Sequence, residues 1–161
     1  MENKITLYSS RLKSFGFLII SLLAVIGATT LLDDTNKPYI EWFIIFFFSL
    51  GSIIFLYRAI KPDSLILSKD GFEVTRTFGK KYFTSWNDVG EFKIVSIRIG
   101  YYTAKKMVGY NFVSTYNHEK IGRAISWELS RVEAAFPDNY GKNNKDLIEL
   151  LNNWKDKNSK Q

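Results

Sequence analysis

The sequence has no cysteine and a single histidine, His118, among its 161 residues. Without cysteine the chain forms no disulfide, has no thiolate nucleophile and offers no sulfur ligand to zinc. A zinc site needs three or four ligands at defined spacing, so one histidine beside Glu119 indicates a solvated loop residue rather than a metal ligand. We therefore expect neither a metal nor a cofactor.

Motifs of common enzyme classes are also missing. The sequence contains no Walker phosphate-binding loop, no dinucleotide fingerprint and no serine elbow. Acid–base catalysis needs carboxylates held in a pocket. Asp70 and Asp138 instead stand in turn sequences, where aspartate bonds nearby backbone amides. The sequence predicts a protein that is not an enzyme.

Charge is almost absent from two long apolar segments, Ser14 to Leu32 and Tyr39 to Tyr57. Each is close to the roughly 20 residues that cross a bilayer core, and both are apolar all round, which favours lipid over a protein interior. Glu41, near the start of the second segment, is the one charged residue, and we expect it to reach the headgroups. A cleaved signal peptide is the alternative for the first segment, although its apolar run is long and no clear cleavage site precedes Asp33.

Lysine and arginine flank this pair of segments on the side away from the connecting loop: Lys4, Arg11, Lys13, Arg58 and Lys61. The loop Asp33–Pro38 carries one lysine against two aspartates. Cytoplasmic flanks are enriched in lysine and arginine, and so short a loop forces an antiparallel helical hairpin. The prediction is a multi-pass protein of the inner (cytoplasmic) membrane with both termini cytoplasmic.

The overall charge is modestly basic, with 22 lysines and arginines against 16 aspartates and glutamates and a net charge of +6. These cations are scattered and form no concentrated patch or nucleic-acid motif, so we expect no nucleic-acid partner. A scattered basic excess suits a domain held against an anionic leaflet. The bilayer itself is the first expected partner.

From Pro62 onward the sequence changes to short strand-like runs separated by turn residues, which indicates a meandering antiparallel sheet. The expected strands are residues 65–67, 72–75, 82–86, 89–99 and 107–113. Gly71 is expected to close a hairpin turn with a positive φ. The number of strands between Gly100 and Ser130 stays open.

Two helical patterns follow the strands. Ile121, Ile125, Leu129 and Val132 recur at helical spacing, whereas Val132, Ala134 and Phe136 alternate like a strand. We favour a short helix to about Glu128, followed by a strand that ends at Pro137. A second apolar stripe predicts an amphipathic helix at about residues 144–157; its members are Leu147, Leu150, Leu151 and Trp154. We read residues 1–61 as a pre-membrane segment with the transmembrane hairpin, and residues 62–161 as a cytoplasmic domain.

Several segments of the sequence resemble those of small bacterial membrane proteins that carry a pleckstrin-homology-like (PH-like) domain on a two-helix anchor. These segments are Ile5–Arg11 before the first span, Ser85–Val89 between two strands, Phe136–Gly141, and Asp146–Leu147 with Leu151–Trp154. The resemblance implies an α+β fold, in which the helical hairpin precedes an antiparallel split β-barrel closed by the C-terminal helix. It implies no enzymatic activity.

PH-like barrels often bind anionic headgroups through lysines in the hairpins at the open end of the barrel, so the resemblance offers five ligand-binding candidates: Arg76, Lys80, Lys81, Lys105 and Lys106. Lysines at hairpin tips also serve solubility and protect sheet edges, and this reading stays open beside the first. The expected function is a non-catalytic binding or recruitment module for a protein segment or an anionic lipid headgroup. The alternative is a membrane-bound interaction protein, such as a toxin-immunity or stress-associated accessory factor.

Overall fold

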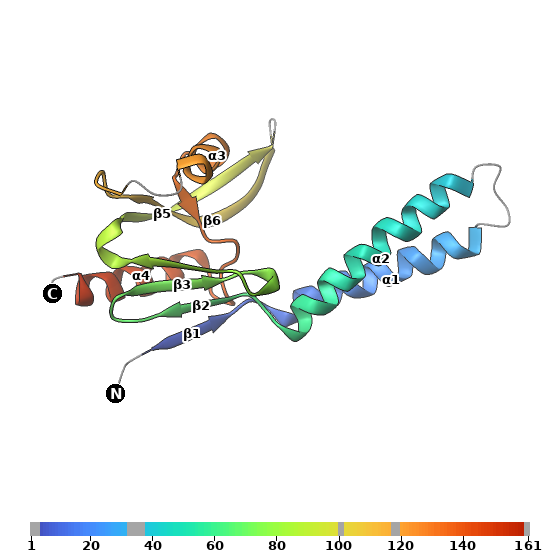
Figure 1. Ribbon diagram of the computed structural model, residues 1–161, viewed down its shortest axis with the longest axis horizontal. Helices are drawn as coiled ribbons and strands as arrows, with labels where there is room; N and C mark the ends of the chain where they lie inside the picture. The colour runs from blue at the N-terminus through green and yellow to red at the C-terminus, as the bar shows by residue number, and fades with distance from the viewer. Residues whose placement is uncertain (1–3, 32–37, 100–101, 117–119, 160–161) are drawn as a thin grey trace. The chain divides into compact units, whose positions relative to one another are not determined.

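The computed structural model describes residues 4–31, 38–99, 102–116 and 120–159 (Figure 1). The chain divides into two compact units. The hairpin unit comprises Ser10–Asp63 and Arg76–Gly79, and the β unit comprises Met1–Ser9, Ser64–Thr75 and Lys80–Gln161. Residues 33–37 of the expected loop between the two spans and the His118–Glu119 pair lie outside the described residues.

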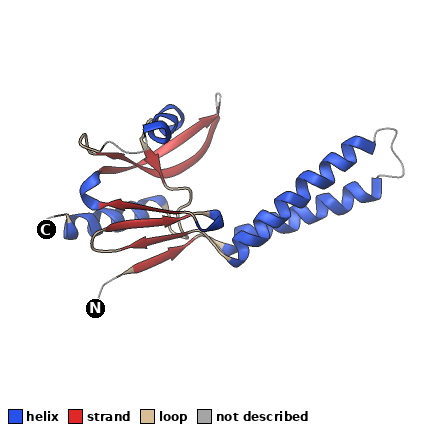
Figure 2. Ribbon diagram, in the orientation of Figure 1, coloured by secondary structure: helices blue, strands red, loops and turns tan. Residues whose placement is uncertain are grey.

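Two long helices make up most of the hairpin unit. Helix α1 spans Arg11–Leu31, helix α2 spans Pro38–Ile60, and the two pack along each other in opposite directions (Figure 2). Each is long and apolar enough to cross a membrane. Both helices extend beyond the apolar segments at their charged ends, because the helical backbone continues through Arg11 and Arg58.

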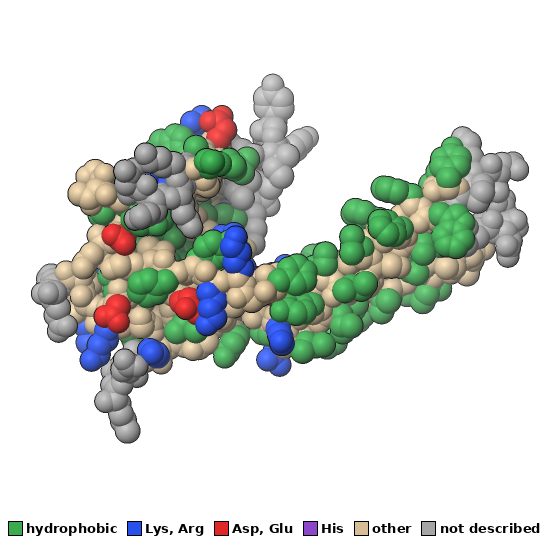
Figure 3. Space-filling model, viewed as in Figure 1, with side chains coloured by type: hydrophobic (Ala, Val, Ile, Leu, Met, Phe, Trp, Pro, Cys, Tyr) green, Lys and Arg blue, Asp and Glu red, His purple; other side chains and the backbone are tan. Residues whose placement is uncertain are grey.

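The seam between α1 and α2 is lined by small side chains. Ser14, Ser21 and Ala28 of α1 are buried at a spacing of seven residues, and Ser52 and Ala59 of α2 are buried as well. Small residues let two helices approach closely in lipid, and a seven-residue repeat keeps them on one side of a helix. The large apolar side chains consequently point outward and cover both helices (Figure 3).

Glu41 lies in the first turn of α2, on the side of that helix that faces α1. Its side chain is buried, with 9% exposure. Its Oε2 atom accepts no hydrogen bond from the described part of the chain. Its expected contact with the headgroups stays a prediction.

The described strands of the β unit form two antiparallel sheets. The first sheet has the order β1-β2-β3-β4, with β1 Ile5–Tyr8, β2 Ser64–Leu67, β3 Gly71–Thr75 and β4 Lys81–Ser85. The second has the order β5-β6-β7, with β5 Val89–Ile99, β6 Tyr102–Phe112 and β7 Ala134–Ala135. Within the described residues the ladders of the two sheets do not join into a closed barrel.

Strand β1 is not anticipated by the sequence analysis, which assigns its residues to the pre-membrane segment. Ile5 lies opposite Leu67 and Tyr8 lies opposite Ser64, so β1 and β2 are neighbours in the first sheet. The helical hairpin is therefore an insertion between two paired strands. Few residues separate the end of β1 at Tyr8 from the start of α1 at Arg11.

The core of the β unit joins both sheets to the last helix, α4 (Asn144–Asn158). Phe72 is fully buried at its centre, with its ring centroid 5.3 to 6.2 Å from those of four other aromatic residues: Trp86, Phe92, Tyr110 and Phe136. Leu147 and Leu151 of α4 are also fully buried. The predicted helix at 144–157 is present, and Asn143 caps it by accepting a hydrogen bond from the amide of Asp146.

Glycine in the β2–β3 hairpin has a different role from the expected one. The residues with positive φ include Gly79 and Gly141 but not Gly71. A Cβ atom on Gly71 would lie 2.1 Å from the carbonyl oxygen of Thr84. Gly71 is required because β3 and β4 approach closely there, and the expectation of a positive φ is wrong.

The buried aromatic core predicts a large difference between two phenylalanines on adjacent strands. Phe72→Ala removes a fully buried ring and should lower the free energy of unfolding by about 3–5 kcal/mol. Phe83 is more than half exposed on β4, so Phe83→Ala should change it by about 0.5 kcal/mol or less. Urea unfolding of the full chain in detergent micelles, followed by circular dichroism, measures both. Equal destabilisation by the two variants would contradict this core.

Candidate functional site

Three of the five sequence-predicted cations lie on the β3–β4 hairpin. Arg76 and Lys80 are exposed around its turn, and Lys81 is the first residue of β4. The ammonium group of Lys80 lies 5.1 Å from the ring centroid of Tyr82, and that of Lys81 lies 3.1 Å from a carboxylate oxygen of Glu73. Two of these cations thus have partners on the hairpin itself.

The other two candidates belong to the second sheet. Lys105 and Lys106 are consecutive in β6, where they lie opposite Ile97 and Ser96 of β5. Lys106 is exposed, and the side chain of Lys105 lies outside the described residues. The five candidates are therefore divided between two sheets, and their shared role in binding an anionic headgroup stays a prediction.

A buried carboxylate organises the hairpin unit where α2 ends. Asp63 is 4% exposed; it accepts a hydrogen bond from Arg58 at 2.9 Å and another from the hydroxyl of Thr77 at 3.1 Å. Thr77 begins the short 3₁₀ segment η1 (Thr77–Gly79) of the β3–β4 turn. Asp63 therefore fastens this turn to the last turn of α2.

An aromatic pair completes the contact between the turn and α2. Phe78 has a φ of 66°, a left-handed conformation that is unusual for a bulky residue. Its ring centroid lies 5.1 Å from that of Tyr57, yet the side chain remains 69% exposed. Lys61 approaches the same tyrosine, with its ammonium group 6.0 Å from the ring centroid. Aromatic and basic side chains thus gather where the second apolar helix ends.

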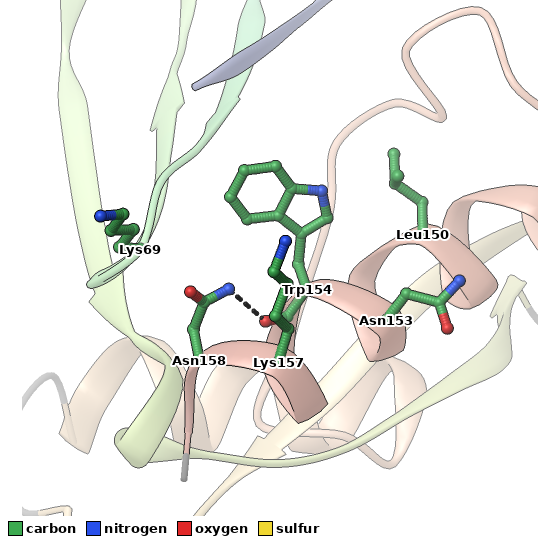
Figure 4. A pocket seen from close by; sticks show the side chains of 6 residues that line it. All are labelled: Lys69, Leu150, Asn153, Trp154, Lys157 and Asn158. Atoms are coloured by element: carbon green, nitrogen blue, oxygen red, sulfur yellow. Dashed lines mark hydrogen bonds between the residues drawn. The ribbon is translucent and has the colours of Figure 1, made fainter. Parts of the chain in front are cut away.

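A pocket of about 230 Å³ lies between the β2–β3 turn and the second half of α4 (Figure 4). We call it the α4 pocket, and its lining residues are Lys69, Leu150, Asn153, Trp154, Lys157 and Asn158. Figure 4 shows Lys69 across from the side chains of the helix. Trp154 packs partly on the core, and Asn158 donates a hydrogen bond to its carbonyl oxygen at 2.7 Å.

The β2–β3 turn holds Lys69 in place. The indole nitrogen of Trp86 donates to the carbonyl oxygen of Ser68 at 2.9 Å, and the hydroxyl and amide of Ser68 both donate to the carbonyl oxygen of Gly71. Trp86 is 1% exposed, so the turn is anchored in the core. The lysine that reaches the pocket is consequently carried by a rigid element.

The charges of the α4 pocket select among ligands. Lys69 and Lys157 favour negative charge, whereas the C-terminal end of a helix carries a partial negative charge that disfavours it. Phosphate groups are usually bound at helix N-termini, and this pocket lies at the opposite end. Leu150 and Trp154 add an apolar wall. The arrangement suits a single carboxylate accompanied by an apolar group better than a phosphate.

This pocket is not predicted by the sequence. Trp154 belongs to the apolar stripe predicted for the last helix, which agrees with its packing on the core, and no sequence pattern assigns a role to Lys69 or Lys157. The one sequence feature that points to the pocket is Lys69 in the tight β2–β3 turn, but the sequence does not show that this turn lies beside α4. No group of three or more metal-ligating side chains occurs within the described residues.

Comparisons of the chain with protein-family models, with curated proteins and with solved structures give no match.

The Asp63 contacts predict how firmly the β3–β4 turn is held. Thr77→Val removes a hydrogen bond to a carboxylate, a kind of bond that contributes about 1.5–3 kcal/mol, so the turn should open at least roughly tenfold more often. Trypsin cleavage after Arg76, followed by mass spectrometry on the full chain in micelles, measures this opening. Thr77→Ser keeps the hydroxyl and should be cleaved at the original rate. Identical cleavage of the valine and serine variants would contradict the role of Asp63.

Proposed function

We propose that this chain is an integral membrane protein in which α1 and α2 cross the cytoplasmic membrane and hold a non-catalytic binding module at its inner surface. The observation that carries this proposal is the apolar surface of both helices, on which Leu23 of α1 and Phe46 and Ile53 of α2 are each more than 60% exposed. Side chains of this size are costly to leave in water along two whole helices. Lipid removes that cost, because it surrounds such helices with apolar chains.

The end of α2 supports the same reading. Tyr57 and Phe78 form the aromatic pair there, and Arg58 and Lys61 supply positive charge. Aromatic and basic residues of this kind mark the interface between bilayer and water. Lysine and arginine near α1 and α2, on the side opposite their connecting loop, favour a cytoplasmic location for both termini.

The β unit supports a PH-like module. Two antiparallel sheets and a C-terminal helix, within the described residues, are the observations that support it. The split barrel itself is inferred from the resemblance of the sequence. Because the chain enters the hairpin from β1 and returns through β2, two covalent links hold the module beside the bilayer. Such tethering raises the effective concentration of the module for partners at the membrane.

The α4 pocket is the binding site that we assign to this module. Its ligand is a segment of a partner protein that presents an apolar side chain to Trp154 and Leu150, with a carboxylate between Lys69 and Lys157. The negative end of α4 makes a phosphorylated headgroup the weaker candidate. The function is recruitment of such a partner to the membrane surface.

Membrane insertion predicts a specific labelling pattern. The chain has no cysteine, so Thr35→Cys in the connecting loop and Gln161→Cys at the C-terminus each introduce a single thiol. A membrane-impermeant maleimide should label position 35 in spheroplasts and position 161 only after lysis. Alkaline carbonate should leave both variants in the membrane pellet. Release into the supernatant, or the reverse labelling pattern, would contradict the proposal.

The α4 pocket predicts position-dependent cross-linking. A photoreactive amino acid at Asn153, which lines the pocket, should form a discrete protein adduct in native membranes, and one at Lys145, exposed on the same helix, should not. Lys69→Glu with Lys157→Glu should reduce the yield of the adduct at least roughly tenfold, because two attractive charges become repulsive ones.

Two other results of this experiment have defined meanings. Adducts with lipid alone would identify the ligand as a headgroup instead of a protein segment. Substitution of Lys80, Lys81, Lys105 and Lys106 by Gln would then test whether the sequence-predicted cations bind it. Equal adducts from positions 153 and 145 would remove the pocket as the binding site.

A further inference from the structure

Helix α3 (Lys120–Ser130) faces the opposite way from an ordinary surface helix. It is strongly amphipathic, and its apolar stripe of Ile121, Ile125 and Leu129 lies within an arc of about 80°. All three side chains are more than half exposed, whereas Ser126 and Ser130 on the other side are partly buried. A surface helix normally buries its apolar stripe against the core. Here the stripe points away from the core.

This orientation is fixed by an ionic contact. Arg123 lies between α3 and the second sheet, and its guanidinium group donates to the carboxylate of Glu133 and to the carbonyl oxygen of Tyr116. The same group lies 5.4 Å from the ring centroid of Phe112. Glu133 in turn accepts a hydrogen bond from the amide of Phe112 at 2.7 Å. Helix α3 is therefore held with its polar side on the sheet and its apolar side free.

The residues around the stripe carry charge of both signs. Trp127, 45% exposed, lies on the opposite side of α3 from the stripe. Lys120 is the first residue of α3, and the exposed Arg131 follows its last residue. Arg131 ends the helix in a left-handed conformation with a φ of 57°, and its amide donates to the carbonyl oxygen of Trp127. Amphipathic helices that lie in the plane of a membrane interface turn their apolar face to the acyl chains and their polar face to water. Glu128, also exposed, is the one acidic residue of α3, and it lies beside the stripe, about 20° from Ile121 around the helix.

The size of the stripe argues against a protein partner. An 11-residue helix is roughly 16 Å long and 10 Å wide, so the face of α3 covers on the order of 160 Å². A stable protein interface buries about 800 Å² on each partner. A second copy of this chain would not be held through this face alone. A lipid interface has no such minimum area, because each inserted side chain contributes separately.

We propose that α3 is a membrane-interface helix whose Ile121, Ile125 and Leu129 enter the boundary between headgroups and acyl chains. The proposal rests on the membrane insertion of α1 and α2, since the links through β1 and β2 then keep the β unit at the bilayer surface. The anionic headgroups attract Arg131, the exposed cation that follows α3. The β unit would thus have a third, non-covalent attachment to the bilayer, which restricts its orientation.

Spin labels on single cysteines test the proposal in the full chain, reconstituted into vesicles of phosphatidylcholine and phosphatidylglycerol. A label at Ile125→Cys should lie about 5–10 Å below the headgroup boundary, as measured by its collision rates with oxygen and with a water-soluble nickel chelate. A label at Lys145→Cys, exposed on α4, should collide freely with the chelate. A label at Phe46→Cys, exposed on α2, should be fully protected from it.

A second variant separates the stripe from the rest of the helix. Ile121→Asn with Leu129→Asn should return the label at position 125 to water, and the fold should be retained because both side chains are exposed. Circular dichroism checks that retention. Without the two Asn substitutions, a label at position 125 is compared directly with the controls. If it collides with the chelate as freely as the label at position 145, while the label at position 46 stays protected, the α3 proposal is overturned and the insertion of α2 is not.

The remaining outcomes are also decisive. Free access of the chelate to positions 46 and 125 together would overturn the insertion of α1 and α2 as well. Broadening of the spin-label spectrum, caused by labels at position 125 of two copies lying close together, would assign the stripe to self-association. That result would overturn the lipid proposal.

Discussion

Pairing between β1 and β2 is the constraint on which the rest of this structure depends. The two strands lie side by side, although the whole helical hairpin separates them in sequence. Neighbouring strands are about 4.8 Å apart, and packed helices have axes about 8–10 Å apart. The two short links that leave these strands are therefore compatible with helices that pack closely. The small residues Ser14, Ser21 and Ala28 make this close packing possible.

Asp63 is a second fixed point in the same part of the chain. It combines the end of α2 with the β3–β4 turn through Arg58 and Thr77. The turn is held in an unusual conformation at Phe78, and such conformations persist where the surrounding contacts determine them. A strained backbone at Phe78 and the buried carboxylate of Asp63 thus lie together where α2 ends.

Much of the fold could be predicted from local patterns. The two apolar helices, the last helix and most strands follow from hydrophobic runs, periodicity and turns, because these features depend on neighbouring residues. Strand β1 could not be predicted with the same means, because four residues have no clear periodicity and their partner lies far along the chain. The burial of Glu41 on the inner side of α2 could not be predicted either, because composition identifies a span but not the face on which a residue falls.

The candidate sites show the same limit. The sequence indicates the apolar stripe of α3, but its outward direction depends on Arg123 and Glu133, which are brought together by the turn after the helix. The α4 pocket requires Lys69 and Lys157 to meet although they belong to distant segments. Lys81 was expected to be available to a ligand, and only the strand register places it beside Glu73.

The position of the hairpin between β1 and β2 also determines the order in which the protein can fold during synthesis. Strand β1 is translated before both helices and has no partner until β2 has been translated after them. Bringing distant strands together costs loop-closure entropy. Under the membrane insertion proposed above, a hairpin already assembled in the bilayer would lower this cost by holding its two ends near each other, and completion of the sheet would be coupled to insertion of the helices. A chain that fails to insert would expose an unpaired edge strand, the kind of surface by which quality-control proteases and chaperones recognise immature proteins.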